Sequence, residues 1–174
     1  GQIGSALLSK YGGKKIGVGS TGPKDWLPPD PETNAGEGKD FRKIKDLLYL
    51  NPKKIIIGIG GNYTTGIESL LERLYNITPE SELIVYGPPA PALAEKNSKV
   101  AKKYKSVFNR EYNYNNLYSS RKRKSRRIEE AVINSDFKNK KFVNTFALTE
   151  GYTCKGSCDA IHLVGEPVKR ILGA

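Results

Sequence analysis

The single histidine of this chain, His162, lies three residues after Asp159 near the C-terminus. A carboxylate at this spacing can hold one imidazole nitrogen while the other nitrogen serves as a general base. The same two residues could equally be a helix cap followed by a histidine at the start of a helix, and the spacing leaves both interpretations open. If an imidazole does chemistry in this protein, it is that of His162, with Asp159 as its candidate partner.

Two glycine-containing loops follow apolar strand patterns and carry groups that could bind a negatively charged oxygen. Asn62 ends the run Gly60-Gly61-Asn62, where a side-chain amide can project above a sheet and donate to a developing oxyanion. Gly19 opens the run GSTG after an earlier strand pattern. Taken singly, a glycine after a strand is more often a turn requirement, and Asn62 is equally plausible as a turn or a helix cap.

Helical and strand patterns alternate along the chain and must position these groups. Helices are predicted over Gln2–Tyr11, Asp40–Leu50, Thr64–Leu74, Ser119–Asn134 and Glu166–Leu172, strands over Lys15–Val18, Lys54–Ile59, Glu82–Tyr86 and Lys141–Val143, and an exposed loop over Pro28–Gly38. Uniformly apolar strands separated by helices predict an α/β fold, with a mainly parallel sheet and helices on both faces. The loops after the strands then meet at one edge of the sheet. We see no repeat or domain boundary, so residues 1–174 are expected to form a single domain.

Composition excludes several classes of protein. The chain has 174 residues and a net charge of +11, from 29 Lys and Arg against 18 Asp and Glu. No apolar run approaches the roughly 18 residues that a membrane-spanning helix requires. Strong apolar runs alternate with amphipathic stretches, which excludes a disordered tail. The two cysteines are too few for a disulfide framework in a chain of this length.

A basic run, Arg121–Arg127, concentrates the positive charge and follows three tyrosines interleaved with asparagines. Its six cations are Arg121, Lys122, Arg123, Lys124, Arg126 and Arg127. Such a run is usually a solvated helix face. Here it falls at the start of a predicted helix, where the macrodipole disfavours cations, and an anionic partner would explain that placement. Nucleic acid, an anionic glycopolymer and an acidic protein surface all fit.

Cys154, Cys158 and His162 recur every four residues, which could suggest zinc. Tetrahedral sites normally draw ligands from more than one segment, and the chain has no other cysteine or histidine. No metal is therefore expected. A local disulfide that braces the loop before Asp159 is favoured in an oxidising compartment, and two free thiols are expected otherwise.

Together these segments resemble the SGNH, or GDSL-type, hydrolases. Gly19 in GSTGPKDWL, the run GIGGN ending at Asn62, the segment VYGPPAP and the run DAIHL look like conserved blocks of that family, in the right order over nearly the whole chain. The resemblance implies a flavodoxin-like three-layer α/β/α sandwich. It also implies that the Gly19 N–H and the Asn62 side chain form an oxyanion hole, with His162 as base and Asp159 as its orienting carboxylate. Such enzymes cleave esters, often acetyl esters on carbohydrates or cell-wall polymers, so the implied substrate is an acylated small molecule or polysaccharide, and no cofactor is expected.

The family's first block, a strand ending in Gly-Asp-Ser, has no counterpart, because the chain opens with Gly1 directly at the first predicted helix. Ser5 lies inside that helix and Ser20 belongs to the second block, so neither is a convincing nucleophile. We expect the strand and its serine to lie upstream, cleaved or left out, so that an N-terminal peptide carrying the serine is a candidate partner. A processed N-terminus would fit an extracellular protein or a component of a larger assembly.

Two expectations follow from this missing block. Gly1 should lie near His162 and Asn62, and a strand position beside Lys15–Val18 and Lys54–Ile59 should be vacant or separately occupied. The alternative function is a catalytically silent relative that keeps the fold and binds a structural partner or polyanion through its basic run, because a fold alone does not secure an activity.

Overall fold

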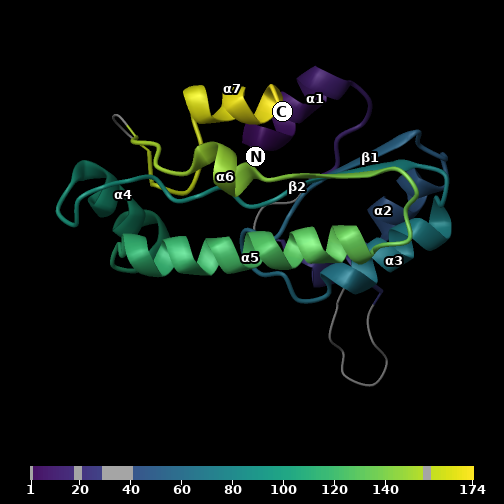
Figure 1. Ribbon diagram of the computed structural model, residues 1–174, viewed down its shortest axis with the longest axis horizontal. Coiled ribbons are helices and arrows are strands. Elements are labelled where there is room, and N and C mark those ends of the chain that lie inside the picture. Colours follow the sequence, from purple (N-terminus) through teal and green to yellow (C-terminus); the bar gives the residue numbers. More distant parts are fainter. Residues whose placement is uncertain (1, 18–20, 29–40, 155–157) are drawn as a thin grey trace.

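A three-stranded parallel sheet forms the centre of the protein, in a computed structural model that describes residues 2–17, 21–28, 41–154 and 158–174 (Figure 1). The strands β1 (Lys54–Gly58), β2 (Glu82–Tyr86) and β3 (Lys140–Val143) lie in the order β1-β2-β3. Ile56 pairs with Ile84, and Val85 pairs with Phe142. The predicted α/β class with a parallel sheet is therefore confirmed.

Helices cover both faces of this sheet. The helices of the described residues are α1 (Gln2–Tyr11), the short 3₁₀ helix η1 (Pro23–Trp26), α2 (Phe41–Leu48), α3 (Ile67–Ile77), α4 (Lys99–Phe108), α5 (Tyr114–Asn134), α6 (Thr145–Thr149) and α7 (Glu166–Leu172). Side chains alternate along β2, so Leu83 and Val85 pack toward α3 and α5, whereas Ile84 and Tyr86 pack toward α1 and α7 (Figure 1).

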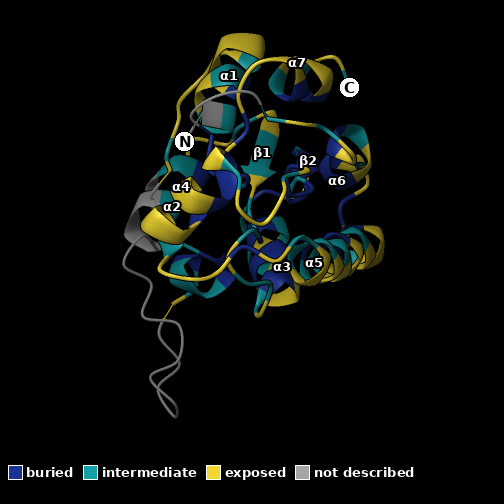
Figure 2. Cartoon of the chain, turned by 90° about the vertical axis from the view of Figure 1, so that its left-hand side faces the viewer, coloured by how far each residue is buried: buried dark blue, intermediate teal, exposed yellow. Residues whose placement is uncertain are grey.

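The apolar face predicted for α3 is confirmed, because its four helically spaced positions Ile67, Leu70, Leu71 and Leu74 are all buried. Figure 2 shows the same division in α5, which buries one face and exposes the opposite one along its length. None of the helices in the described ranges is both long and apolar enough to cross a membrane.

The strand predicted over Lys15–Val18 is wrong for residues 15–17, which have no strand structure, and Val18 lies outside the described residues. A strand needs a neighbour for its backbone hydrogen bonds, and β1 is the edge strand of the sheet that the described residues form. Ile16 nevertheless packs, half-buried, against the core on the α3 side of the sheet. The loop over residues 29–38 and the position of Gly1 lie outside the described residues.

The region before the basic run is more helical than its composition suggests. Helix α4 was not predicted, and its N-terminus is capped by Ser98, whose hydroxyl accepts a hydrogen bond from the Ala101 N–H. Helix α5 begins at Tyr114 rather than Ser119, with Asn113 as its cap. Arg121 therefore lies in the interior of α5, where the macrodipole has little effect. The argument that the basic run sits at an unfavourable helix start is wrong.

Candidate active site

Three loops meet at the edge of the sheet where the parallel strands end. Gly60-Gly61-Asn62 follows β1, and residues 87–92 follow β2. The segment that carries Asp159 is fastened to the second of these loops, because the Ala92 N–H donates to the Ala160 carbonyl at 2.9 Å. A parallel bridge between Leu93 and Thr153 adds a second link. The loop after β1 and the segment that carries Asp159 are about 100 positions apart in the sequence, and both lie at this end of the sheet.

Asp159 and His162 form the pair that the sequence predicts. His162 Nδ1 lies 2.6 Å from Asp159 Oδ2. Asp159 Oδ1 accepts the backbone N–H groups of Ile161 at 3.0 Å and of His162 at 2.9 Å. The carboxylate is nearly buried, while the side chain of His162 is 67% exposed. With Nδ1 directed at the carboxylate, Nε2 lies on the opposite side of the ring and is the nitrogen left for a substrate or nucleophile.

The electrostatics of the pair favour an ionised aspartate. Burial alone would raise the pKa of the Asp159 carboxyl, but the hydrogen bonds from the His162 backbone N–H, the His162 ring and the Ile161 backbone N–H outweigh it and lower the pKa below its usual value. A carboxylate that stays ionised can hold the imidazole in one tautomer and stabilise an imidazolium.

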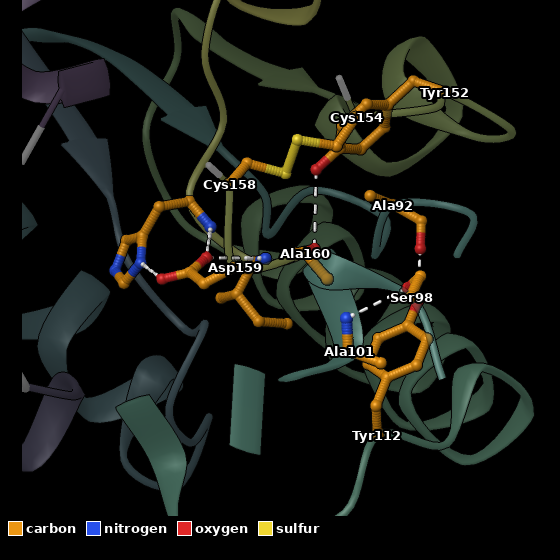
Figure 3. The surroundings of a disulfide bond; sticks show 11 residues. Ala92, Ser98, Ala101, Tyr112, Tyr152, Cys154, Cys158, Asp159 and Ala160 are labelled. Carbon is orange, nitrogen blue, oxygen red and sulfur yellow. Dashed lines mark hydrogen bonds and ion pairs between the residues drawn. A yellow bond between two sulfur atoms is a disulfide. The ribbon is translucent and has the colours of Figure 1, made fainter. Parts of the chain in front are cut away.

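A strained residue supports this geometry. Ala160, between the two partners, has a φ of 69° and is fully buried. This left-handed conformation costs a non-glycine residue roughly 1–2 kcal/mol, and such strain persists where the surroundings hold it in place. The Ala160 carbonyl is held by the Ala92 N–H and by the Tyr152 hydroxyl (Figure 3).

The loop before Asp159 is braced by a disulfide between Cys154 and Cys158, with Cα atoms 6.2 Å apart (Figure 3). Neither cysteine is therefore a free thiol. Phe108, at the end of α4, stacks on the His162 ring with centroids 6.1 Å apart and planes 20° apart. Within the described ranges no group of three or more His, Cys, Asp or Glu side chains is arranged to hold a metal ion.

Asn62 lies beside the loop that contains Gly19, although Gly19 itself is outside the described residues. Asn62 Nδ2 donates to the Thr21 carbonyl at 3.3 Å. An amide nitrogen carries two hydrogens, so one N–H is left to donate to another acceptor.

The next residue fastens the same two loops together. The Tyr63 hydroxyl and the Gly22 N–H both donate to Asp25 Oδ2, at 2.5 and 2.7 Å. Burial, and then the hydrogen bond to Asp25, raise the pKa of Tyr63 to about 12.

The basic run is divided between the interior and the surface. Arg121 is buried and its Nη1 donates to the Pro89 carbonyl at 3.1 Å. Lys124 is half-buried, and its Nζ donates to the carbonyls of Gly61 at 3.1 Å and Asn62 at 2.8 Å. The run is thus not one continuous surface patch. Its more exposed cations are Lys122, whose Nζ lies over the Tyr118 ring, Arg127, which pairs with Glu68, and Arg123 and Arg126.

The sequence contained a signal for these inward cations that was missed. Arg121, Lys124, Ser125 and Ile128 recur at intervals of three and four residues, which is the spacing of one helix face, and this face continues into the buried Ala131 and Val132. The helix predicted over Ser119–Asn134 already contains this whole pattern. Phe108 carried no signal, because α4 was not predicted.

Comparison of the chain with sequence models of protein families, with curated proteins and with solved structures found no match. The resemblance to SGNH hydrolases therefore depends on the four segments quoted above and on the geometry of the residues within them.

Proposed function

We propose that this chain belongs to a serine ester hydrolase of SGNH type, with a flavodoxin-like three-layer α/β/α fold. Its substrate would be an acylated small molecule or a carbohydrate or cell-wall ester. The observation that carries the proposal is the 2.6 Å contact between His162 Nδ1 and Asp159 Oδ2, in a loop fastened at the carboxyl edge of a parallel sheet. Asn62, in the loop after β1, supplies a side-chain amide at the same edge.

In the proposed reaction a serine from a segment outside this chain attacks the acyl carbon. Its hydroxyl proton passes to His162 Nε2, while Asp159 stays ionised and stabilises the imidazolium. The tetrahedral oxyanion accepts hydrogen bonds from the Asn62 amide and the Gly19 N–H. The bond between the acyl carbon and the alcohol oxygen then breaks, and the alcohol leaves with the proton from Nε2. Water repeats the sequence on the acyl-serine and releases the carboxylic acid and the free serine.

The edge of the sheet at β1 supports a place for that serine. In the described part of the chain β1 pairs only with β2, and its three isoleucines, Ile55, Ile56 and Ile57, are half-buried rather than buried. The strands of a parallel sheet are normally buried on both faces of the sheet. An additional parallel strand beside β1 would end at the carboxyl edge next to the Asn62 loop, and its last residue would lie within the proposed site.

A catalytically silent polyanion-binding protein is the second candidate. The observation that favours it is the exposed part of α5, where Arg123, Arg126 and Arg127 reach solvent and Lys122 is partly exposed. Because Arg121 and Lys124 are engaged by backbone carbonyls, only the other four cations are tested as polyanion contacts.

The two candidates are separated by assays on the protein produced from its gene with whatever residues are encoded before Gly1. The hydrolase should turn over p-nitrophenyl acetate and react with a serine-directed phosphonate. His162→Ala should lower kcat by at least about 10³-fold with only a small loss of thermal stability, whereas Lys169→Ala on α7 should change neither. Full activity in His162→Ala would exclude the proposed mechanism.

Duplex DNA is the probe for the second candidate. Neutralising Lys122, Arg123, Arg126 and Arg127 should reduce the slope of log affinity against log salt concentration by about 0.9 for each lost phosphate contact. Absence of ester turnover, together with this loss of DNA affinity, would replace the hydrolase by the polyanion-binding protein.

A further inference from the structure

Two cations on one face of α5 connect the loops of the proposed site. Lys124 Nζ binds the Gly61 and Asn62 carbonyls at 3.1 and 2.8 Å, in the loop that follows β1. Arg121 Nη1 binds the Pro89 carbonyl at 3.1 Å, in the loop that follows β2. The two residues are three positions apart, so their Cα atoms are separated by slightly less than one helical turn, about 4.5 Å along the axis. One rigid helix thus contacts both loops.

The loop bound by Arg121 is fastened to the segment that carries the Asp159–His162 dyad, because the Ala92 N–H donates to the Ala160 carbonyl in that segment. The loop bound by Lys124 carries Asn62. Helix α5 therefore contacts both the loop of the proposed oxyanion donor and the loop to which the proposed base is fastened. Productive geometry requires such groups to be held within fractions of an ångström by rigid elements.

The stability of the fold does not explain these two charges. In the described part of the chain neither cation forms a direct ion pair, and both bind neutral carbonyl oxygens. The negative charge of Asp159 favours the Arg121 cation but does not offset the effect of its burial. Burial lowers the pKa of both side chains, and for Lys124 the charge of Arg121 lowers it further. Cations held close together away from water cost stability, and apolar side chains of similar volume are often better tolerated there. A role at the site explains why charges occupy these positions.

We propose that Lys124 is a positioning residue for Asn62, and that Arg121 positions the loop to which the dyad is attached. By binding two consecutive carbonyls, the Lys124 ammonium fixes the peptide planes on both sides of Asn62 and with them the direction of its side-chain amide. The effect of Lys124 on catalysis rests on the proposed function. The effect of Lys124 on the conformation of the Asn62 loop is independent of that function.

The catalytic test uses Lys124→Met in the full encoded protein with p-nitrophenyl acetate. We expect kcat to fall roughly tenfold to a hundredfold with KM within about twofold, and Lys124→Arg to restore part of the rate. Lys103→Met, an exposed lysine on α4, is the matched control and should leave both constants unchanged. In an Asn62→Ala background Lys124→Met should cost nothing further, because both changes remove the same contribution. Equal losses in the two backgrounds would show that Lys124 does not act through Asn62.

Carbonyl ¹³C NMR tests the positioning without any turnover. In Lys124→Met the Gly61 and Asn62 carbonyl signals should move upfield, because both oxygens lose a hydrogen-bond donor, whereas Lys103→Met should leave them in place. Unchanged carbonyl signals in a folded Lys124→Met protein would overturn the proposal. If wild-type protein shows no ester turnover but the signals move, only the proposed function fails. Arg121→Met is the companion variant for the Pro89 carbonyl, and the Lys124 result stands if that variant does not fold.

Discussion

Replacing Gly60 by alanine tests the turn that connects β1 to Asn62. Gly60 has a φ of +95°, and an added Cβ would lie 2.1 Å from Ile128 Cδ1 and 3.3 Å from its Cγ1. Ile128 is fully buried, so its side chain cannot turn away without displacing core neighbours. The left-handed conformation costs an alanine roughly 1–2 kcal/mol, and overpacking a core costs about 1–3 kcal/mol. We expect Gly60→Ala to lower the free energy of unfolding by about 2–5 kcal/mol.

Two other glycines separate these contributions. Among the described residues, no neighbouring atom lies within 4 Å of a Cβ built on Gly13 or Gly61, and of the two only Gly13 has a positive φ, +85°. Gly13→Ala should therefore report the strain alone, about 1–2 kcal/mol, and Gly61→Ala should change stability by less than about 0.5 kcal/mol. Urea unfolding measures all three, with a lowered midpoint and an unchanged m-value as the sign of lost stability.

The order of the three losses in unfolding free energy tests whether both the strain and the contact with Ile128 are present. A Gly60→Ala loss equal to that of Gly13→Ala would mean that Ile128 moves aside at no cost, and a loss equal to that of Gly61→Ala would refute both the strain and the close contact. Under the proposed function, ester hydrolysis should fall most in Gly60→Ala, because a displaced turn would shift Asn62 away from the proposed oxyanion position.

The remaining predictions concern the dyad loop. Burial raises the pKa of Asp159, but the hydrogen bonds from His162 and Ile161 outweigh it and hold this pKa below its usual 3.8, so its stabilisation is present above the unfolded pKa and is lost as the pH falls through the lower folded one. Urea unfolding from about pH 6 to pH 2 should thus show a shallower acid loss in Asp159→Asn than in the wild type, and an identical slope would contradict the assignment. Replacing both Cys154 and Cys158 by alanine should lower the free energy of unfolding by roughly 2 kcal/mol, and a reductant should then destabilise only the wild type.

Local patterns in the sequence were sufficient for several of the regular elements and for the Asp159–His162 pair. The bounds of α1, β2 and α7 agree with their predictions, because apolar periodicity depends only on residues within a few positions. Asp159 and His162 could be paired from spacing for the same reason. The carboxylate receives both the ring and the backbone N–H of a residue three positions away.

Partners far apart in the chain could not be predicted in this way. The absence of a strand over residues 15–17 depends on which strand lies beside them, and a strand has no ladder without a neighbour. The contact between Asn62 and the Thr21 carbonyl joins residues 41 positions apart. No local pattern contains that information, because the distance is set by how helices and strands pack.

The basic run shows the same limit for charge. From sequence, six cations in seven residues indicate a solvated face, since a charged side chain is normally hydrated. Helix α5 begins at Tyr114 rather than Ser119. It packs over the loops after β1 and β2, and the face that contacts these loops carries Arg121 and Lys124. The composition of the helix was determined by the sequence alone. Tertiary packing decided which of its cations contact water and which bind the Asn62 and Pro89 carbonyls. These carbonyls lie more than thirty residues away in the chain, so local sequence does not place them.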